Sequence, residues 1–304
     1  MSIISLNIPN LERNKPLAPF TTYQIGGPAD LFVEVYTIDE LTHALLEAQR
    51  KGVPFFLLGC GANILVTDKG FRGLIIRNLA NKVTFLDNSR VLAESGATVA
   101  HLIEHCRNRE LSGFEHFIGI PSTVGGALWQ NLHFLSADRQ RTLFIEEIVL
   151  SSHILTKEGQ HRTVQVDYFQ FGYDQSILQK RQDVVLDVTF QLIAKRKDEI
   201  QIVMDENTAW RNAKQPQLSE YPSCGSVFKK IKGIGAGRLI EQAGLKGARI
   251  GNAEVSKKHA NFIVNTGNAR AADILQLIRY VQEEVKRKLG YTLETEITII
   301  GEQE

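Results

Sequence analysis

The chain has 304 residues, 43% of them hydrophobic and 23% charged, which are the proportions of a globular protein that buries a sizeable core. Its 35 basic and 34 acidic residues leave a net charge of +1, which excludes a global field that would attract nucleic acid or an anionic membrane. The length predicts two or three packed domains.

The cysteines indicate where the protein works. Cys60, Cys106 and Cys224 are scattered and odd in number, so they form neither a metal-binding spacing nor a disulfide framework. Residues 1–15 lack the apolar core of a signal peptide, and no apolar run approaches the roughly 20 residues that span a bilayer. We therefore expect a cytoplasmic protein without a bound metal.

In the first quarter of the chain, Thr21 to Ile25 favours a strand, which Gly26-Gly27-Pro28 ends, and residues 29–35 predict another strand. Thr37 to Glu40 fits a capping box for a helix that runs to Lys51. Strands are expected at 53–58, 64–66 and 74–77. This order of elements indicates a small α/β unit.

Further along, residues 83–86 and 91–93 predict a hairpin, and 99–107 a helix capped by Thr98. Strands are expected at 145–155, 159–166 and 184–194, followed by a helix at 198–213 and an exposed connection at 214–222. Ile274, Ile278, Val281 and Val285 follow one helical face that Gly290 ends. Residues 295–300 predict a closing strand.

Two glycine-rich segments could bring the backbone close to a ligand. Gly59 to Asn63 follows an apolar strand and could present N–H groups to a pyrophosphate, although taken alone a tight turn is the more common explanation. A Rossmann site is not supported, because Ile64 stands where the third glycine of that motif should be. Gly119 to Ala127 could wrap a neutral ring system, or it could be a glycine-rich turn between strands.

The stretch from Tyr221 to Asn265 holds the polar groups best suited to chemistry. Ser226 lies outside any G-x-S-x-G motif, so proton donation fits it better than hydrolysis, although a turn residue is the simpler reading. A polar cluster runs from Ser256 to Asn261, and its His259, taken alone, is more often a structural histidine than a ligand. Glu296 lies in an otherwise apolar strand, where a buried carboxylate costs free energy unless it is paired or functional.

Seven segments in this order resemble one family. They are TTYQIGGPADLFVE, LLGCGANILVTDKGFRGLII, LSGFEHFIGIPSTVGGALWQN, YPSCGSVFK, GAGRLIEQAGLKGARIG, VSKKHANFIVN and LETEITIIG. Together they are similar to the UDP-N-acetylenolpyruvoylglucosamine reductases, over nearly the whole chain. No insertion bearing a substrate-clamping tyrosine is evident, so the chain is closer to the shorter type of that family.

The resemblance implies an α+β protein with a PCMH-type (vanillyl-alcohol-oxidase-like) FAD-binding fold in two subdomains, followed by a C-terminal α+β substrate domain. The expected boundaries are residues 1–80 and 81–203 for the two FAD-binding subdomains, and 204–304 for the substrate domain. The implied reaction is the NADPH-dependent reduction of UDP-N-acetylglucosamine enolpyruvate to UDP-N-acetylmuramate, a peptidoglycan precursor.

The resemblance also assigns residues to roles. Ser226 matches the serine that protonates the substrate, and Glu296 matches the glutamate at that site. The residues implied for FAD are Thr22, Gly59, Cys60, Gly61, Ala62, Asn63, Ile64, Leu65, Gly119, Ile120, Pro121, Ser122, Thr123, Gly125, Gly126 and Ala127. Those expected to contact the UDP-sugar are Tyr173, Lys214, Lys230, His259 and Arg141.

The sequence departs from the family pattern at three places. Asp174 stands where the family usually has an active-site arginine, and Leu132 to Leu135 replaces a Gly-Ala-Tyr-Gly segment. Lys230 replaces an asparagine. We therefore considered that Arg139 or Arg141 supplies the missing positive charge. Two alternative functions remain open here: a flavin enzyme of the same fold with another acceptor, and a non-catalytic homologue that binds a UDP-sugar or FAD.

Overall fold

The structure is a computed structural model that describes residues 6–231 and 233–302. The chain divides into two compact units. Unit 1 comprises Met1–Asn10, Val33–Cys60 and Ile76–Trp210, and unit 2 comprises Leu11–Phe32, Gly61–Ile75 and Arg211–Glu304. This grouping differs from the three consecutive domains expected above, which stay a prediction. Residues 1–5, at the start of the segment examined for a signal peptide, lie outside the described part.

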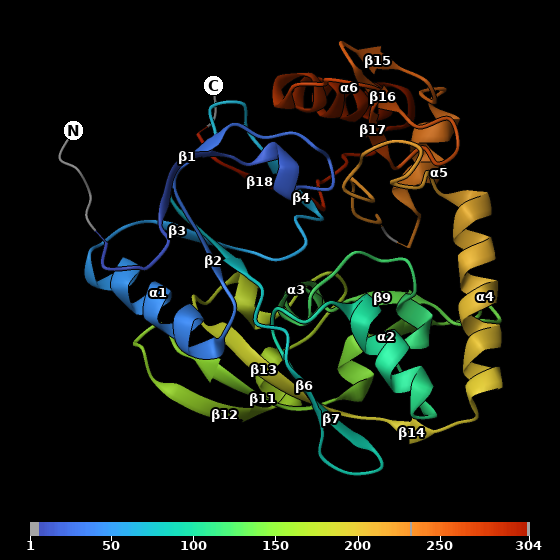
Figure 1. Ribbon diagram of the computed structural model, residues 1–304. Coiled ribbons are helices and arrows are strands. Elements are labelled where there is room, and N and C mark those ends of the chain that lie inside the picture. Colours follow the sequence, from blue (N-terminus) through green and yellow to red (C-terminus); the bar gives the residue numbers. More distant parts are fainter. Residues whose placement is uncertain (1–5, 232, 303–304) are drawn as a thin grey trace. The chain divides into compact units, whose positions relative to one another are not determined.

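Three of the five passages of the chain between the units lie within continuous elements (Figure 1). These are β2 (Pro28–Val35), β5 (Phe71–Asn78) and the helix α4 (Lys197–Lys214). A four-stranded sheet has the order β1-β2-β5-β3, in which β1 is Glu12–Pro16 and β3 is Phe55–Leu58.

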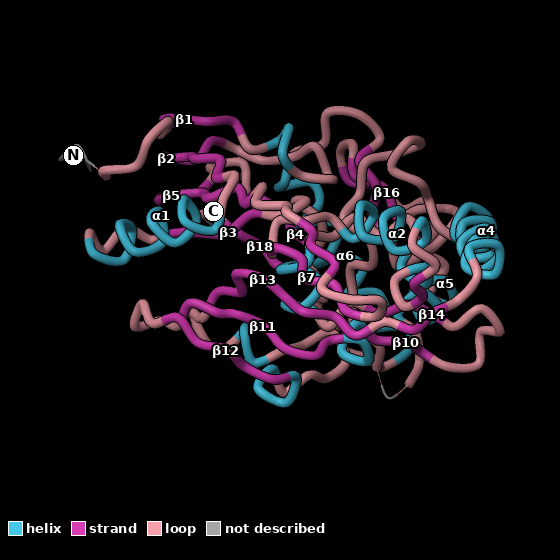
Figure 2. Tube along the Cα trace, turned by 60° about the horizontal axis from the view of Figure 1, so that its bottom comes forward, coloured by secondary structure: helices cyan, strands magenta, loops and turns pink. Residues whose placement is uncertain are grey.

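Unit 1 is built on a five-stranded sheet of order β12-β11-β13-β7-β6 in which every pair of neighbours is antiparallel. Figure 2 shows β11, β12 and β13 side by side. Alternate residues of β13, including Val188 and Phe190, are fully buried, as expected of a strand with one face on the core. The bounds are Val83–Phe85 for β6, Arg90–Glu94 for β7, Val149–Leu155 for β11, His161–Gln165 for β12 and Val184–Gln191 for β13.

Besides the part of α4 up to Trp210, unit 1 contains three helices, each of which begins at a threonine. Thr37 accepts a hydrogen bond from the Glu40 N–H at the start of α1 (Ile38–Arg50), and Thr98 does the same at α2 (Val99–Asn108). The Glu40 carboxylate bonds the Tyr36 N–H at 2.7 Å, so the expected capping box closes one residue earlier. Thr123 caps α3 (Val124–Gln130). Helices α2 and α3 pack apolar side chains into one core with the large sheet.

Short elements connect these parts of unit 1. Two small antiparallel pairs join β8 (Leu111–Ser112) with β14 (Ile193–Ala194), and β9 (His133–Leu135) with β10 (Thr142–Phe144). Single 3₁₀ turns lie at Glu115–Phe117, Ile145–Ile148, Val166–Phe169 and Ile177–Gln179.

Unit 2 has its own core around α5 (Ala236–Gln242) and α6 (Ala271–Leu289). The predicted face of α6, which carries Ile274, Ile278, Val281 and Val285, is buried, and Gly290 ends the helix at φ +76°. A three-stranded sheet has the order β15-β16-β17, with bounds Arg249–Ile250, Ala253–Val255 and Ile263–Asn265. Strand β4 (Ile64–Val66) pairs in parallel with β18 (Thr298–Ile300).

Two expectations about local structure were wrong. Thr21 to Ile25 is a turn after the 3₁₀ helix Ala18–Phe20, because the Thr21 hydroxyl bonds both the N–H and the C=O of Ile25. Such side-chain bonds to the backbone compete with strand pairing. The segment from Gly119 to Ala127 is not all loop, since the Thr123 cap starts a helix at Val124.

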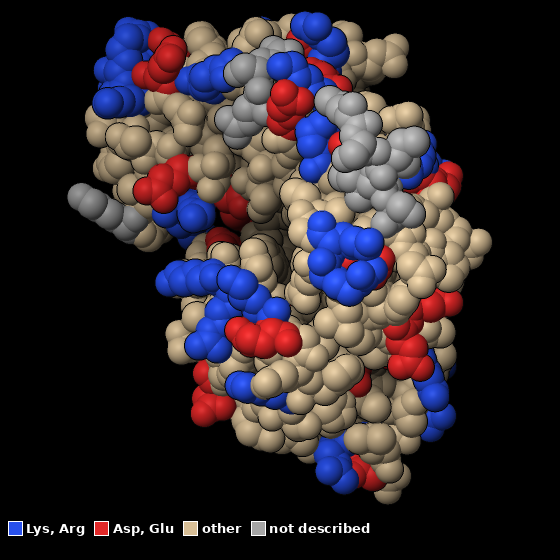
Figure 3. Space-filling view, turned by 90° about the vertical axis from the view of Figure 1, so that its left-hand side faces the viewer, with Lys and Arg blue, Asp and Glu red and all other residues tan. Residues whose placement is uncertain are grey.

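Within residues 6–231 and 233–302, no helix combines the length and the apolar character needed to cross a membrane. In the same residues, no group of three or more His, Cys, Asp or Glu side chains could hold a metal ion. Basic and acidic side chains are interspersed over the face drawn in Figure 3, as the near-balance of charges in the composition implies.

Candidate functional site

The site in unit 2 is organised by the C-terminal segment from Glu294 to Ile300. It first runs antiparallel to the segment that follows Ser226. The Glu296 N–H donates to the Val227 C=O at 2.8 Å, and the Lys229 N–H donates to the Glu294 C=O at 2.9 Å. Phe228 and Thr295 face each other between these bonds. Ser226 and Glu296, far apart in the sequence, are thereby brought to adjacent backbone segments, and the strand expected at 295–300 is formed only at Thr298–Ile300.

The same C-terminal segment then runs along the turn that was predicted to bind FAD. Thr298 donates its N–H to the Asn63 C=O at 3.0 Å, and the Asn63 amide donates to the Glu296 C=O at 3.5 Å. Beyond this point β18 pairs with β4, which contains Ile64 and Leu65. Glu296 therefore lies where one strand is bonded to the Ser226 segment and to the Asn63 turn.

Thr22 belongs to this cluster too. Its N–H donates to the Gly61 C=O at 3.0 Å, which joins two residues predicted for FAD. Gly61 has φ +65°, and a Cβ there would stand 1.9 Å from the Phe20 C=O, so only glycine fits. In the described part of the chain, the N–H groups of Cys60, Gly61 and Ala62 donate to no acceptor. Consecutive donors of this kind suit the phosphate of a nucleotide.

Unit 1 brings the other two FAD-assigned segments together. A Cβ on Gly59 would stand 2.6 Å from the Thr123 hydroxyl oxygen, so the turn after β3 packs directly on the Thr123 loop. The N–H groups of Gly125 and Gly126 are used inside the protein, by Ser95 C=O and the Thr123 hydroxyl. Those of Ser122 and Thr123 meet no acceptor among the described residues. These unused donors and the glycine turns fit a dinucleotide such as FAD.

Ser226 lies in the segment that runs beside Glu296. Its hydroxyl, half-buried, bonds no other group in the described residues. Beside it Gly225 has φ +88°. No atom lies within 4 Å of the position that a Cβ would take, so crowding by neighbouring atoms does not impose this conformation. The next residue back, Cys224, is buried, and burial, aided by the charge of Glu296, raises the pKa of its thiol to about 12. Cys224 therefore stays a neutral thiol.

His259 is tied to the same segment through Asn261. Its Nδ1 accepts the Asn261 N–H at 3.2 Å, while burial, and then the charge of Lys246, lower its pKa. The imidazole is thus neutral at pH 7 and carries its proton on Nε2, where it can donate to an anionic ligand. Lys214 and Lys230, also expected to contact substrate, are exposed.

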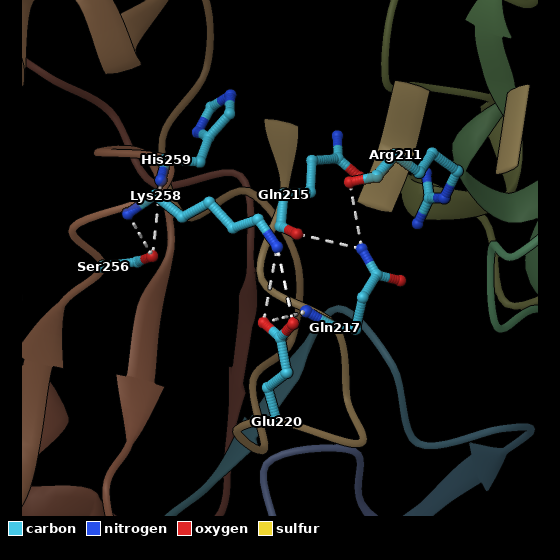
Figure 4. A network of polar contacts seen from close by, with 7 residues as sticks. All are labelled: Arg211, Gln215, Gln217, Glu220, Ser256, Lys258 and His259. Atoms are coloured by element: carbon cyan, nitrogen blue, oxygen red, sulfur yellow. Dashed lines mark hydrogen bonds and ion pairs between the residues drawn. The ribbon is translucent and has the colours of Figure 1, made fainter. Parts of the chain in front are cut away.

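A polar network holds the turn that carries His259 (Figure 4). Ser256 accepts hydrogen bonds from the N–H groups of Lys258 and His259 at 3.2 and 3.3 Å. The Lys258 ammonium lies 3.5 Å from the carboxylate of Glu220, which in turn accepts from the Gln217 N–H. The connection at 214–222, expected as an exposed linker, therefore anchors the His259 turn.

In unit 1, Tyr173 and Asp174 occupy a turn next to His133. The His133 Nδ1 lies 3.6 Å from the Asp174 carboxylate, and its ring lies 4.5 Å between centroids from that of Tyr173, tilted by 46°. Arg141 pairs with Glu147 at 3.0 Å, and Arg139 donates to Asn207 at 2.7 Å. His133 is thus a basic side chain close to Asp174. That Arg139 or Arg141 supplies the positive charge missing at position 174 stays a hypothesis.

Comparison with known proteins gives the family. A model of the FAD binding domain matches residues 29–165, and a model of the UDP-N-acetylenolpyruvoylglucosamine reductase C-terminal domain matches residues 215–300. The UDP-N-acetylenolpyruvoylglucosamine reductase of Shouchella clausii is 40% identical over 96% of this chain and 91% of its own. The chain belongs to the UDP-N-acetylenolpyruvoylglucosamine reductase family.

Other members agree. The Listeria monocytogenes UDP-N-acetylenolpyruvoylglucosamine reductase is 39% identical over 96% of this chain and 95% of its own. The crystal structure of the Thermus caldophilus UDP-N-acetylenolpyruvylglucosamine reductase matches with a TM-score of 0.79 and 32% identity, over 96% of this chain and 98% of that one. The expected α+β fold with a PCMH-type FAD-binding region is confirmed.

The FAD binding match includes the segments around Gly59 and Thr123, and the reductase C-terminal match includes Ser226, His259 and Glu296. Lys214 lies one residue outside the latter match. In the sequence, Asn261 ends a polar cluster and has no assigned role. An asparagine within an apolar run is the one feature that could have drawn attention to it, but only the fold shows which groups its amide bonds.

Proposed function

We propose that this chain catalyses the reaction for which its family is named, with Ser226 and Glu296 at the reacting double bond. The observation that carries this proposal is the 2.8 Å bond from the Glu296 N–H to the Val227 C=O, which aligns the two segments. In the reaction the enolpyruvyl C=C bond gains a hydride at its terminal carbon and a proton at the neighbouring carbon. The product is UDP-N-acetylmuramate.

The cofactors are FAD and NADPH. Cys60, Ser122 and Thr123 in unit 1 have unused N–H groups that suit the nucleotide, and so, in unit 2, do Gly61 and Ala62. When bound, FAD supplies the carrier that takes two electrons from NADPH and delivers a hydride. The remaining chemistry belongs to this chain's own residues.

Ser226 donates the proton that completes the addition. Negative charge that builds on the substrate beside its carboxylate is neutralised as the Ser226 O–H bond breaks, and solvent returns the proton to the serine oxygen. Glu296, half-buried near Cys224, would favour the protonated form of the hydroxyl through its own negative charge.

The UDP-sugar would be recognised by cationic and neutral donors. His259, with its proton on Nε2, and the exposed ammonium groups of Lys214 and Lys230 suit a diphosphate. Tyr173 and Arg141 are the contacts proposed from unit 1. We also propose a cytoplasmic location, because Cys60, Cys106 and Cys224 are free thiols. The net charge of only +1 over the whole chain supports a small-molecule partner rather than nucleic acid.

The test is anaerobic. Purified protein with bound FAD is mixed with NADPH, then with UDP-N-acetylglucosamine enolpyruvate, while the visible absorbance of the flavin is followed. Loss of absorbance with NADPH and its return only with the enolpyruvyl sugar is the expected result. Absorbance that is lost and does not return would indicate an oxidoreductase of this fold with another acceptor. No loss with NADPH would indicate a non-catalytic homologue.

A further inference from the structure

Asn261 lies at the centre of the bonds that hold the Ser226 segment. Its side chain is buried, with 7% of its surface exposed. Its Oδ1 accepts the Phe228 N–H at 3.0 Å, and its Nδ2 donates to the Phe228 C=O at 2.9 Å. An amide group thus pairs with a backbone residue in the way a neighbouring strand would.

The backbone of Asn261 extends this clamp by one residue. Its C=O accepts the Val227 N–H at 2.8 Å, while the Val227 C=O accepts the Glu296 N–H at 2.8 Å from the other side. Every backbone donor and acceptor of Val227 and Phe228 is therefore bonded, two by the Asn261 side chain, one by its backbone and one by Glu296. The residues that follow Ser226 have no freedom to move while these bonds persist.

Asn261 is also bonded to His259, a residue expected to contact the substrate. The Asn261 N–H donates to Nδ1 of His259, which fixes the tautomer of that ring. Gly237 packs on the His259 ring, because a Cβ there would approach it to 3.1 Å. The His259 turn and the Ser226 segment are thus joined through one amide residue.

We propose that Asn261 is a positioning residue which holds the Ser226 hydroxyl at the reacting carbon, an inference that rests on the proposed function. Only asparagine carries the required acceptor and donor at these two positions. Aspartate would set a second oxygen 2.9 Å from the Phe228 C=O, where two acceptors repel. Alanine would leave both groups of Phe228 unbonded.

The test compares FAD-loaded wild type, Asn261→Asp and Asn261→Ala, with Asn207→Ala as control. Asn207 is an equally buried amide of unit 1, with bonds to Arg139 and His116 and none to the Ser226 segment. The loss of flavin absorbance with NADPH should be unchanged in all four proteins. Reduction of the enolpyruvyl sugar should slow roughly tenfold to a hundredfold in both Asn261 variants, because a displaced proton donor costs about that much.

Two further readouts separate positioning from a general loss of structure. The solvent deuterium isotope effect on the slowed step should increase in the Asn261 variants, since proton donation becomes limiting, and stay at the wild-type value in Asn207→Ala. Amide exchange at Phe228 should accelerate in Asn261→Ala, whether or not substrate is turned over.

The outcomes distinguish the two proposals. Wild-type rates for Asn261→Asp, an equal slowing in Asn207→Ala, or slowing with an unchanged isotope effect would overturn the role of Asn261 while the reductase function stands. A wild-type protein that never reduces the enolpyruvyl sugar, with faster Phe228 exchange in Asn261→Ala, would leave the clamp in place and overturn the function.

Discussion

The turn that carries Ser226 and the turn that carries Asp174 are held in different ways. The Ser226 segment of unit 2 is bonded by a neutral amide, Asn261, whose oxygen and nitrogen are both used. The Asp174 turn of unit 1 is tied by Asn131, which donates to the Gly172 C=O at 3.1 Å, and it contains a buried carboxylate 3.6 Å from the ring of His133. The Ser226 segment is held by neutral hydrogen bonds, whereas the Asp174 turn also contains a buried carboxyl group.

This difference suggests a division of work. A proton donor must stay at one place relative to the reacting carbon, and neutral bonds hold it there at any pH near neutrality. At position 174 a carboxyl group stands next to the ring of His133. The departure from the family pattern at Asp174 therefore changes the chemistry of this turn.

The largest expected effect comes from Ser226. Ser226→Ala should slow reduction of the enolpyruvyl sugar by roughly 10² to 10⁴-fold, because it removes the proton donor, with unfolding free energy unchanged since the hydroxyl bonds no described group. Single-turnover absorbance and urea unfolding measure the two quantities.

Ser176→Ala in the other turn is the matched control. Its hydroxyl donates to the Trp129 C=O at 2.8 Å, so this change should cost about 1 kcal/mol of stability and far less of the rate. If Ser176→Ala slows the reaction as much as Ser226→Ala, the two turns do not differ as described.

The His133 and Asp174 side chains should be energetically coupled. A double-mutant cycle of His133→Gln and Asp174→Asn, followed by urea unfolding at pH 7, should give a coupling free energy of about 1 kcal/mol, because the ring faces a buried carboxylate at 3.6 Å. Arg141→Ala and Asp174→Asn should be additive, since Arg141 is paired with Glu147. If His133→Gln and Asp174→Asn prove additive, the two side chains do not interact, and charge does not distinguish the two turns.

The smallest effect concerns His259, whose ring accepts a hydrogen bond from the Asn261 N–H. Burial and Lys246 lower the pKa of His259 in the folded protein, so between that value and about 6.5 the unfolded chain binds more protons. Stability should therefore fall as pH drops from about 6.5 through the folded pKa, and be fully present above 6.5. Urea unfolding of wild type and His259→Gln from pH 7 to pH 5 measures it, and parallel curves would contradict the assignment.

Much of the local structure follows from short patterns. Thr37 and Thr98 cap the predicted helices, and the apolar positions Ile274, Ile278, Val281 and Val285 set the buried face of α6. Such features depend on neighbours within one turn of helix, so the sequence is sufficient. Thr21 misled because its hydroxyl bonds its own backbone, an alternative that strand propensity does not weigh.

By itself, the sequence determined the family, through seven ordered segments, and with it the identity of Ser226 and Glu296 as candidates. Only the tertiary structure decided what lies beside them. The C-terminal strand that bonds Val227 and Asn63, the amide of Asn261 that grips Phe228, and the ring of His133 beside Asp174 join residues far apart along the chain. Contacts of this kind arise from chain reversal and packing, which no local pattern encodes.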